Sequence, residues 1–131
     1  MFSLKSGTNK GNRRIWIEGA RLLAAGLTRG TKLHRLIVDG VMYISTSPMT
    51  GATCHMVAGN ETRPIIDFNG KWVTAFMRDA QYFTVVCDIV DRGSFGDIPA
   101  VVREACENAI DSDNQVFAIY PCHMTELRAA A

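Results

Sequence analysis

The sequence lacks the features of membrane and secreted proteins. No run in its 131 residues approaches the roughly 18 unbroken apolar residues that a membrane span needs. The opening residues 1–6 also lack the apolar core of a secretory signal. We therefore expect a cytoplasmic protein that has no contact with a membrane.

Catalytic signatures are absent too. The sequence contains neither the Gly-x-x-x-x-Gly-Lys-Ser/Thr loop of nucleotide hydrolases nor the Gly-x-Ser-x-Gly elbow of serine hydrolases. The sequence contains two Cys-His dipeptides, Cys54-His55 and Cys122-His123. A histidine next to a cysteine in sequence is not a base that the fold has positioned, so these dipeptides do not predict a catalytic nucleophile. We predict that the protein is not an enzyme and uses no cofactor, with small-molecule catalysis as the least favoured alternative.

Cysteine is scarce, and the four cysteines are Cys54, Cys87, Cys106 and Cys122. We expect reduced thiols, because disulfides are rare in the cytoplasm. The dipeptides Cys54-His55 and Cys122-His123 match a tetrahedral zinc site in ligand type. Neighbouring residues of a strand point to opposite faces, so each dipeptide would need an irregular backbone to donate both ligands. The favoured prediction is no metal site, and zinc is the alternative.

The net charge of the whole chain is close to zero, but the charged residues are unevenly distributed along it. The chain is 47% hydrophobic and 21% charged, a globular composition, with a net charge of +1. Residues 1–36 hold eight basic side chains and one acidic side chain, which gives a net charge of +7. Residues 37–131 hold six basic and twelve acidic side chains, which gives a net charge of −6. A basic pole of this kind attracts phosphate. The alternative is a solvated surface with uneven charge.

The N-terminal third predicts an arm followed by a strand, a helix and a hairpin. Residues 1–12 are polar and basic, which is typical of a flexible arm. Arg14–Glu18 favours a strand, and the helix formers after it predict a short helix that ends at Gly26. Two further β-favouring runs follow, Lys32–Val38 and Val41–Ser45, and the Asp-Gly between them is a strong hairpin signal.

A weaker second copy of this pattern follows. Residues 63–70 echo residues 13–19, and Gly70 lies 51 positions after Gly19. We therefore predict a first unit over 13–45, a connection over 46–62 and a degenerate second unit over 63–95.

The last part of the chain, residues 96–131, predicts a helix, a strand and a tail. Apolar residues recur at helical spacing through residue 110 after Asp97, a plausible N-cap, and Pro99 in the first turn. Gln115–Tyr120 alternates like a strand, and Pro121 is expected to end it. The predicted class is α+β, with one domain over 13–131.

The run Arg14-Ile15-Trp16-Ile17-Glu18-Gly19, with the helix residues 21–27 and Gly30-Thr31-Lys32-Leu33, resembles the swapped-hairpin family of AbrB transition-state regulators and SymE toxins. The resemblance covers residues 13–45. It implies a small β-barrel of two strand–helix–hairpin units, closed within one chain or by a homodimer, with basic residues on DNA. With Lys10 of the arm, the predicted nucleic-acid-binding residues are Lys10, Arg13, Arg14, Arg21, Arg29, Lys32 and Arg35.

These observations lead to two hypotheses of function. The first is a small regulatory protein, a DNA-binding transcription regulator that could also take RNA, acting through the basic segment. Trp16 beside its arginines is a candidate for base stacking, although core packing is the more common role. The alternative is a protein-binding inhibitor or adaptor of mobile-element or phage type that acts on a host nucleic-acid machine, which would use the acidic second half.

Overall fold

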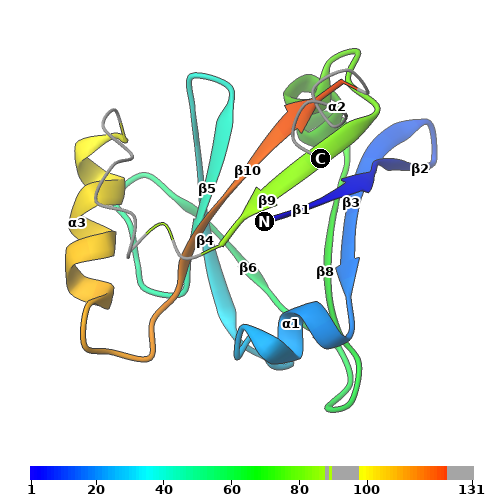
Figure 1. The fold of residues 1–131 in the computed structure, drawn as a ribbon. Coiled ribbons are helices and arrows are strands. Elements are labelled where there is room, and N and C mark those ends of the chain that lie inside the picture. The colour runs from blue at the N-terminus through cyan, green and yellow to red at the C-terminus, as the bar shows by residue number, and fades with distance from the viewer. Residues whose placement is uncertain (88, 90–97, 124–131) are drawn as a thin grey trace. The chain divides into compact units, whose positions relative to one another are not determined.

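The computed structural model describes residues 1–87, 89 and 98–123, which form an α+β fold of three helices and two sheets (Figure 1). The contacts divide the chain into two compact units. Unit 1 comprises Met1 with residues 32–55 and 85–120, and unit 2 comprises residues 2–31, 56–84 and 121–131. Each unit collects segments that are distant in sequence.

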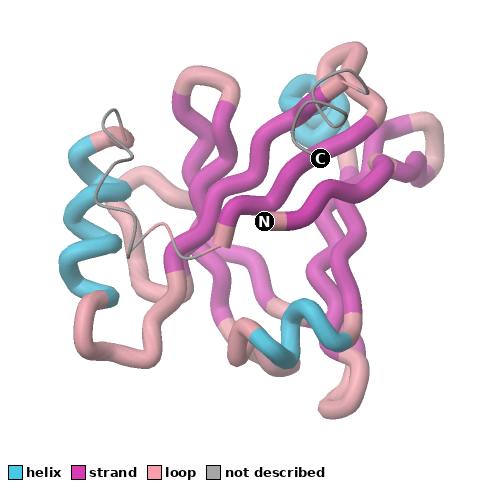
Figure 2. The backbone as a smooth tube through the Cα atoms, viewed as in Figure 1, coloured by secondary structure: helices cyan, strands magenta, loops and turns pink. Residues whose placement is uncertain are grey.

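Strands predominate in the described part of both units, and none of its helices is long and apolar enough to span a membrane (Figure 2). The described strands make two sheets and no closed barrel, so the α+β class is confirmed at this coarser level.

Unit 1 is built on the predicted hairpin. The strand order is β10, β5, β4, β6, formed by β4 (Lys32–Val38), β5 (Val41–Ser45), β6 (Thr53–Met56) and β10 (Val116–Cys122). Both hairpin strands have the predicted bounds, and Val38 pairs with Val41 across the turn. Asp39 and Gly40 have φ of 51° and 78°, the two positive values that a two-residue type I′ turn requires.

Helix α3 (Ala100–Ala109) supplies one wall of the core of unit 1. Its apolar face buries Val102, Ala105, Cys106 and Ala109 in a cluster with strand residues such as Tyr43. This confirms the predicted amphipathic helix. The helix is shorter than predicted and its N-cap is Pro99, whereas the predicted cap, Asp97, lies outside the described residues.

Unit 2 contains a four-stranded sheet in the order β2, β3, β8, β7, together with β1 beside β9. The elements are β1 (Phe2–Lys5), β2 (Gly7–Asn9), β3 (Asn12–Glu18), α1 (Ala20–Ala24), β7 (Ala58–Gly59), β8 (Pro64–Asn69), α2 (Lys71–Met77) and β9 (Tyr82–Val86).

The flexible arm predicted for residues 1–12 is wrong, because this segment contains β1 and β2. Thr8 of β2 pairs with Arg13 of β3. The N–H of Ser6 donates to the carbonyl of Gln81 at 2.8 Å. Backbone hydrogen bonds order this polar segment even though it has few apolar side chains to bury.

Two other boundaries differ from prediction. The connection predicted over 46–62 contains β6 and β7. The C-terminal strand continues through Pro121 to Cys122 instead of ending before the proline. The pairing of β10 with β5 ends at Ile119. Pro121 lies beyond this pairing, so its lack of a backbone N–H removes no hydrogen bond to β5.

The two predicted copies share one local structure. Gly19 and Gly70 both have positive φ, 78° and 117°, and each is the N-cap of a short helix that follows a strand. The two strands, β3 and β8, pair antiparallel with Trp16 opposite Asp67, which are themselves 51 positions apart. An approximate local twofold axis therefore passes through this pair.

This arrangement places the helices of unit 2 at opposite ends of the β3–β8 pair, α1 after β3 and α2 after β8 (Figure 1). Side chains alternate across a strand, so Ile15 and Ile17 of β3 are buried on one face, with Ile66 and Phe68 of β8. Trp16 and Glu18 lie on the other, more exposed face.

We predict that Ile15→Ala destabilises the protein strongly. Ile15 is fully buried (0% exposed), so the substitution removes apolar contacts and leaves a cavity, at a cost of about 2–5 kcal/mol. Leu23 on α1 is 42% exposed, and the control Leu23→Ala is expected to cost less than about 1 kcal/mol. Urea unfolding followed by circular dichroism measures both. Equal shifts of the two midpoints would contradict the assignment of the core.

Candidate nucleic-acid interface

The structure divides the seven predicted nucleic-acid-binding residues between the units. Unit 2 holds Lys10, Arg13, Arg14, Arg21 and Arg29, and unit 1 holds Lys32 and Arg35. Among the described residues, unit 2 has nine basic and four acidic side chains, or +5. Unit 1 has three basic and five acidic, or −2. The basic pole of the sequence is therefore chiefly a property of unit 2.

Arg14 is held by a neighbouring carboxylate. Its Nε and Nη2 donate to the two carboxylate oxygens of Asp67, each at 2.8 Å, in the bidentate geometry that guanidinium favours. The hydrogen bond from Arg14 holds the pKa of Asp67 below its ordinary value. The guanidinium carbon also lies 4.3 Å from the ring centroid of Trp16. Arg14 thus orders the outer face of β3 and has less capacity left for phosphate.

A second ion pair lies at the other end of this face. Arg63 Nη2 lies 2.7 Å from Glu18 Oε2, and the hydrogen bond from Arg63 lowers the pKa of Glu18. Trp16 lies between the two ion pairs in sequence, and Arg14 already contacts its ring. The proposed stacking of a base on Trp16 remains a prediction.

The other lysines and arginines of unit 2 form no ion pair with a described carboxylate. Within the described part of unit 2, Arg14 and Arg63 are the two arginines that form an ion pair with a described carboxylate. The remaining cations of unit 2 are Lys5, Lys10, Arg13, Arg21, Arg29, Lys71 and Arg78. Sequence reasoning missed Lys5, Lys71 and Arg78 because it considered only Lys10 and the segment over 13–45.

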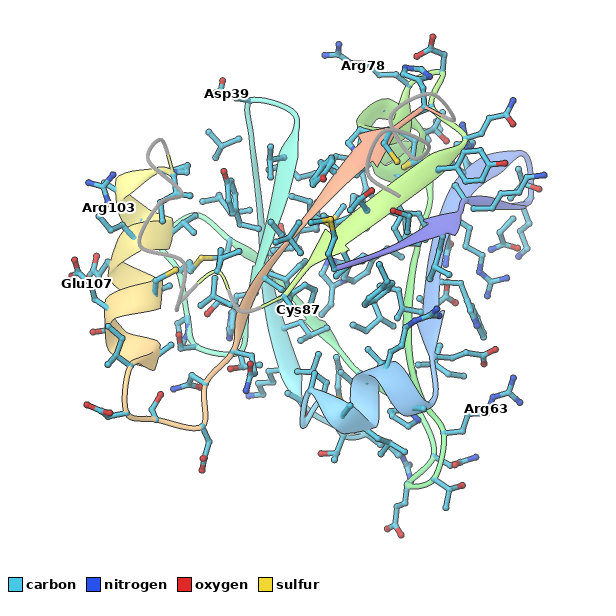
Figure 3. All side chains as sticks on the ribbon, in the orientation of Figure 1. Asp39, Arg63, Arg78, Cys87, Arg103 and Glu107 are labelled. Atoms are coloured by element: carbon cyan, nitrogen blue, oxygen red, sulfur yellow. The ribbon has the colours of Figure 1, made fainter. Side chains whose placement is uncertain are left out.

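Four of these cations lie at the α2 end of the β3–β8 pair: Lys10, Arg13, Lys71 and Arg78. The N–H of Arg13 donates to Thr74 Oγ1 of α2 at 2.9 Å, and Arg13 Nη1 lies 3.5 Å from the carbonyl oxygen of Arg78. We call this set the α2 basic group. Figure 3 shows Arg78 at this end of unit 2 and Arg63 at the opposite end.

The opposite end carries Arg21 on α1 and Arg29 in the loop that follows. Arg21 packs over the ring of Phe2, with 4.7 Å between its guanidinium carbon and the ring centroid. The seven residues of β3 separate the two ends by roughly 20 Å at the usual rise of a strand. Along the axis of B-DNA, about 20 Å corresponds to about six phosphates of one strand.

In unit 1, Arg35 is engaged by a histidine. Arg35 Nε donates to His55 Nε2 at 2.8 Å, and burial, with the charge of Arg35, lowers the pKa of His55. Because His55 Nε2 accepts this hydrogen bond, it carries no proton in this arrangement. The predicted Lys32, at the start of β4, is exposed.

Cys54, Cys106 and Cys122 are free thiols. Cys54-His55 belongs to unit 1 and Cys122-His123 to unit 2. Cys122 is buried, with its Sγ 3.2 Å from Thr84 Oγ1, and His123 Nε2 lies 4.0 Å from Asp79 Oδ1. Within the part of the chain that the structure describes, no three histidine, cysteine or acidic side chains cluster to hold a metal ion.

No family model, curated protein or solved structure matches this chain. The assignment of function therefore depends on the geometry and charge of the described residues.

We predict a pH-dependent loss of stability in Asp67→Asn. The folded pKa of Asp67 is lowered, so its stabilising contribution is present above the ordinary aspartate value of about 3.9 and is lost as the pH falls through the folded value. The urea midpoint of the variant should lie below that of the wild type at pH 7, and the two should converge below about pH 4.

The control is Asp113→Asn, an exposed aspartate of unit 1 that makes no ion pair within the described residues. This variant should unfold like the wild type at both pH values. A difference between Asp67→Asn and the wild type that stays constant with pH would contradict the role of the ion pair.

Proposed function

We propose that the protein is a small nucleic-acid-binding regulatory protein that binds the phosphate backbone of DNA through unit 2. The observation that carries this proposal is the net charge of +5 on the described part of unit 2, where seven cations make no ion pair with a described carboxylate. Unpaired surface cations release condensed counterions from DNA when they contact phosphates, and this release drives binding.

The ordered scaffold supports the same proposal. The α2 basic group and Arg21 with Arg29 occupy opposite ends of β3, so one rigid strand sets the spacing of two phosphate contacts. Contacts of this kind fix the position of a protein on DNA and carry little sequence information. We infer a regulator with modest sequence preference.

The swapped-hairpin resemblance gives the finer form of the proposal. The two strand–glycine–helix copies around the Trp16–Asp67 pair would correspond to the two units of such a barrel. A homodimer would double the number of cations that face DNA, which raises affinity without any new type of contact.

The salt dependence of binding tests this function. We expect the double variant Lys10→Ala/Arg13→Ala to bind a labelled DNA duplex more weakly than the wild type. It should also reduce the slope of log K against log salt by about 1.8, since each lost phosphate contact removes about 0.9. Fluorescence anisotropy at several salt concentrations provides both values, and the same titration with RNA establishes which nucleic acid binds more tightly.

The matched control is Arg103→Ala, which removes one cation from the outer face of α3 in unit 1 (Figure 3). This variant should retain the affinity and slope of the wild type. Binding that is insensitive to salt, or an equal loss in Arg103→Ala, would remove the proposed role of unit 2.

The acidic charge of unit 1 favours a second candidate, a protein-binding inhibitor of a host nucleic-acid machine. Glu104 and Glu107 are exposed on α3, and Figure 3 shows Glu107 pointing away from the strands of unit 1. An acidic face can occupy the basic nucleic-acid site of a partner. Capture of one protein from nuclease-treated lysate by the wild type, and its loss in Glu104→Lys/Glu107→Lys, would favour this candidate over DNA binding.

A further inference from the structure

Unit 2 contains a hollow of about 590 Å³ at the edge of its four-stranded sheet. The residues around it include Arg29, Met56, Val57, Gly59 and Glu61. This volume is within the range of about 300–1,000 Å³ that is usual for small-molecule sites. The wall is formed by the end of β6 and by β7, the outermost strand of the sheet order β2, β3, β8, β7.

The first part of this strand edge is already closed by backbone hydrogen bonds. The N–H of Gly30 donates to the carbonyl of Val57 at 2.9 Å, and the N–H of Val57 donates to the carbonyl of Thr31 at 2.9 Å. The loop that carries Arg29 is thereby fixed along the edge, with its arginine beside the hollow.

The next residue along the same edge, Gly59, is open. Gly59 lies opposite Pro64, and the N–H of Asn60 donates to the carbonyl of Arg63 at 3.1 Å. Hydrogen-bonded and non-hydrogen-bonded pairs alternate in an antiparallel ladder, so Gly59 and Pro64 form a non-hydrogen-bonded pair. The N–H and C=O of Gly59 therefore point away from β8, toward the side where Val57 meets the Thr31 loop.

Gly59 is also fixed as a glycine. Its φ is +83°, and a Cβ at this position would overlap the carbonyl oxygen of Arg63. The backbone therefore presents an adjacent donor and acceptor with no side chain in front of them.

Three side chains of different chemistry surround this backbone pair. Met56 is 60% exposed and offers a soft, adaptable apolar surface. Arg29 and Glu61 are exposed and provide a cation and a carboxylate at the same hollow. This set matches the parts of one nucleotide: a planar base with donors and acceptors on its edge, and an anionic phosphate.

We propose that this hollow binds one unstacked nucleotide of a single-stranded nucleic acid. The base edge pairs with the N–H and C=O of Gly59, its face packs on Met56, its amino group donates to Glu61, and Arg29 contacts the adjoining phosphate. This inference rests on the proposed nucleic-acid-binding function and deepens it, because it adds recognition of a base to contacts with the backbone.

The same observations argue against an extended peptide in the hollow. A peptide that adds to a sheet edge needs a row of open backbone groups. Here Val57 is already paired with the Thr31 loop, and the turn that follows Gly59 ends the strand. The single residue with open backbone groups, Gly59, can pair with the edge of one base but cannot pair with a whole peptide strand.

The test compares Met56→Ala with the wild type on two labelled probes, a 12-nucleotide single strand of mixed sequence and its duplex. We expect Met56→Ala to weaken binding of the single strand by roughly fivefold or more, which is the loss expected when a residue that contributes to binding is truncated to alanine. The affinity for the duplex should not change. The matched control is Ile110→Ala, an apolar residue of unit 1 that is 56% exposed and should leave both affinities unchanged.

A second measurement tests the backbone contact directly. In ¹⁵N-labelled protein, the amide signal of Gly59 should shift on addition of the single strand and should not shift on addition of the duplex at equal salt. An unshifted Gly59 amide, together with wild-type single-strand affinity in Met56→Ala, overturns the nucleotide site while leaving duplex binding by unit 2 intact. Failure of the wild type to bind either probe overturns both the site and the proposed function.

Discussion

The pairing of β3 with β8 is the constraint on which the rest of unit 2 depends. It places two copies of a strand–glycine–helix segment antiparallel, with Trp16 opposite Asp67 at their centre. One face of the pair buries isoleucine side chains, and the other is tied by the ion pairs Arg14–Asp67 and Glu18–Arg63. Because α1 follows one strand and α2 the other, this single pairing also fixes the helices at opposite ends.

The same pairing decides which cations remain for a ligand. The two carboxylates on the outer face of β3–β8 each bind one arginine, so Arg14 and Arg63 serve the scaffold. Partly exposed ion pairs of this kind hold side chains in place more than they add stability. The cations at the two ends of β3 make no ion pair with a described carboxylate, and they carry the proposed contacts with phosphate.

Phosphate binding and base recognition make different demands on structure, and we propose that different parts of unit 2 meet them. Contacts with phosphate need charge spaced along a rigid element, which β3 provides between its two ends. Recognition of a base needs an open donor and acceptor beside an apolar surface. Gly59 and Met56 offer this combination where the short strand β7 ends. Arg29 lies at the hollow and also belongs to the α1 end, so it would serve both kinds of contact.

Local structure was determined largely by the sequence. The hairpin of Lys32–Val38 and Val41–Ser45 follows from its Asp-Gly turn, and the core face of α3 follows from helical spacing. The repeat of residues 13–19 at residues 63–70, 51 positions later, was also predicted from the sequence. Tertiary structure alone decided the rest. The first part of the polar N-terminal segment became β1 because the distant strand β9 was available to pair with it, whereas β2 pairs locally with the adjacent strand β3. The engagement of Arg14 by Asp67 and the open edge at Gly59 depend on strand register, which composition and periodicity do not specify.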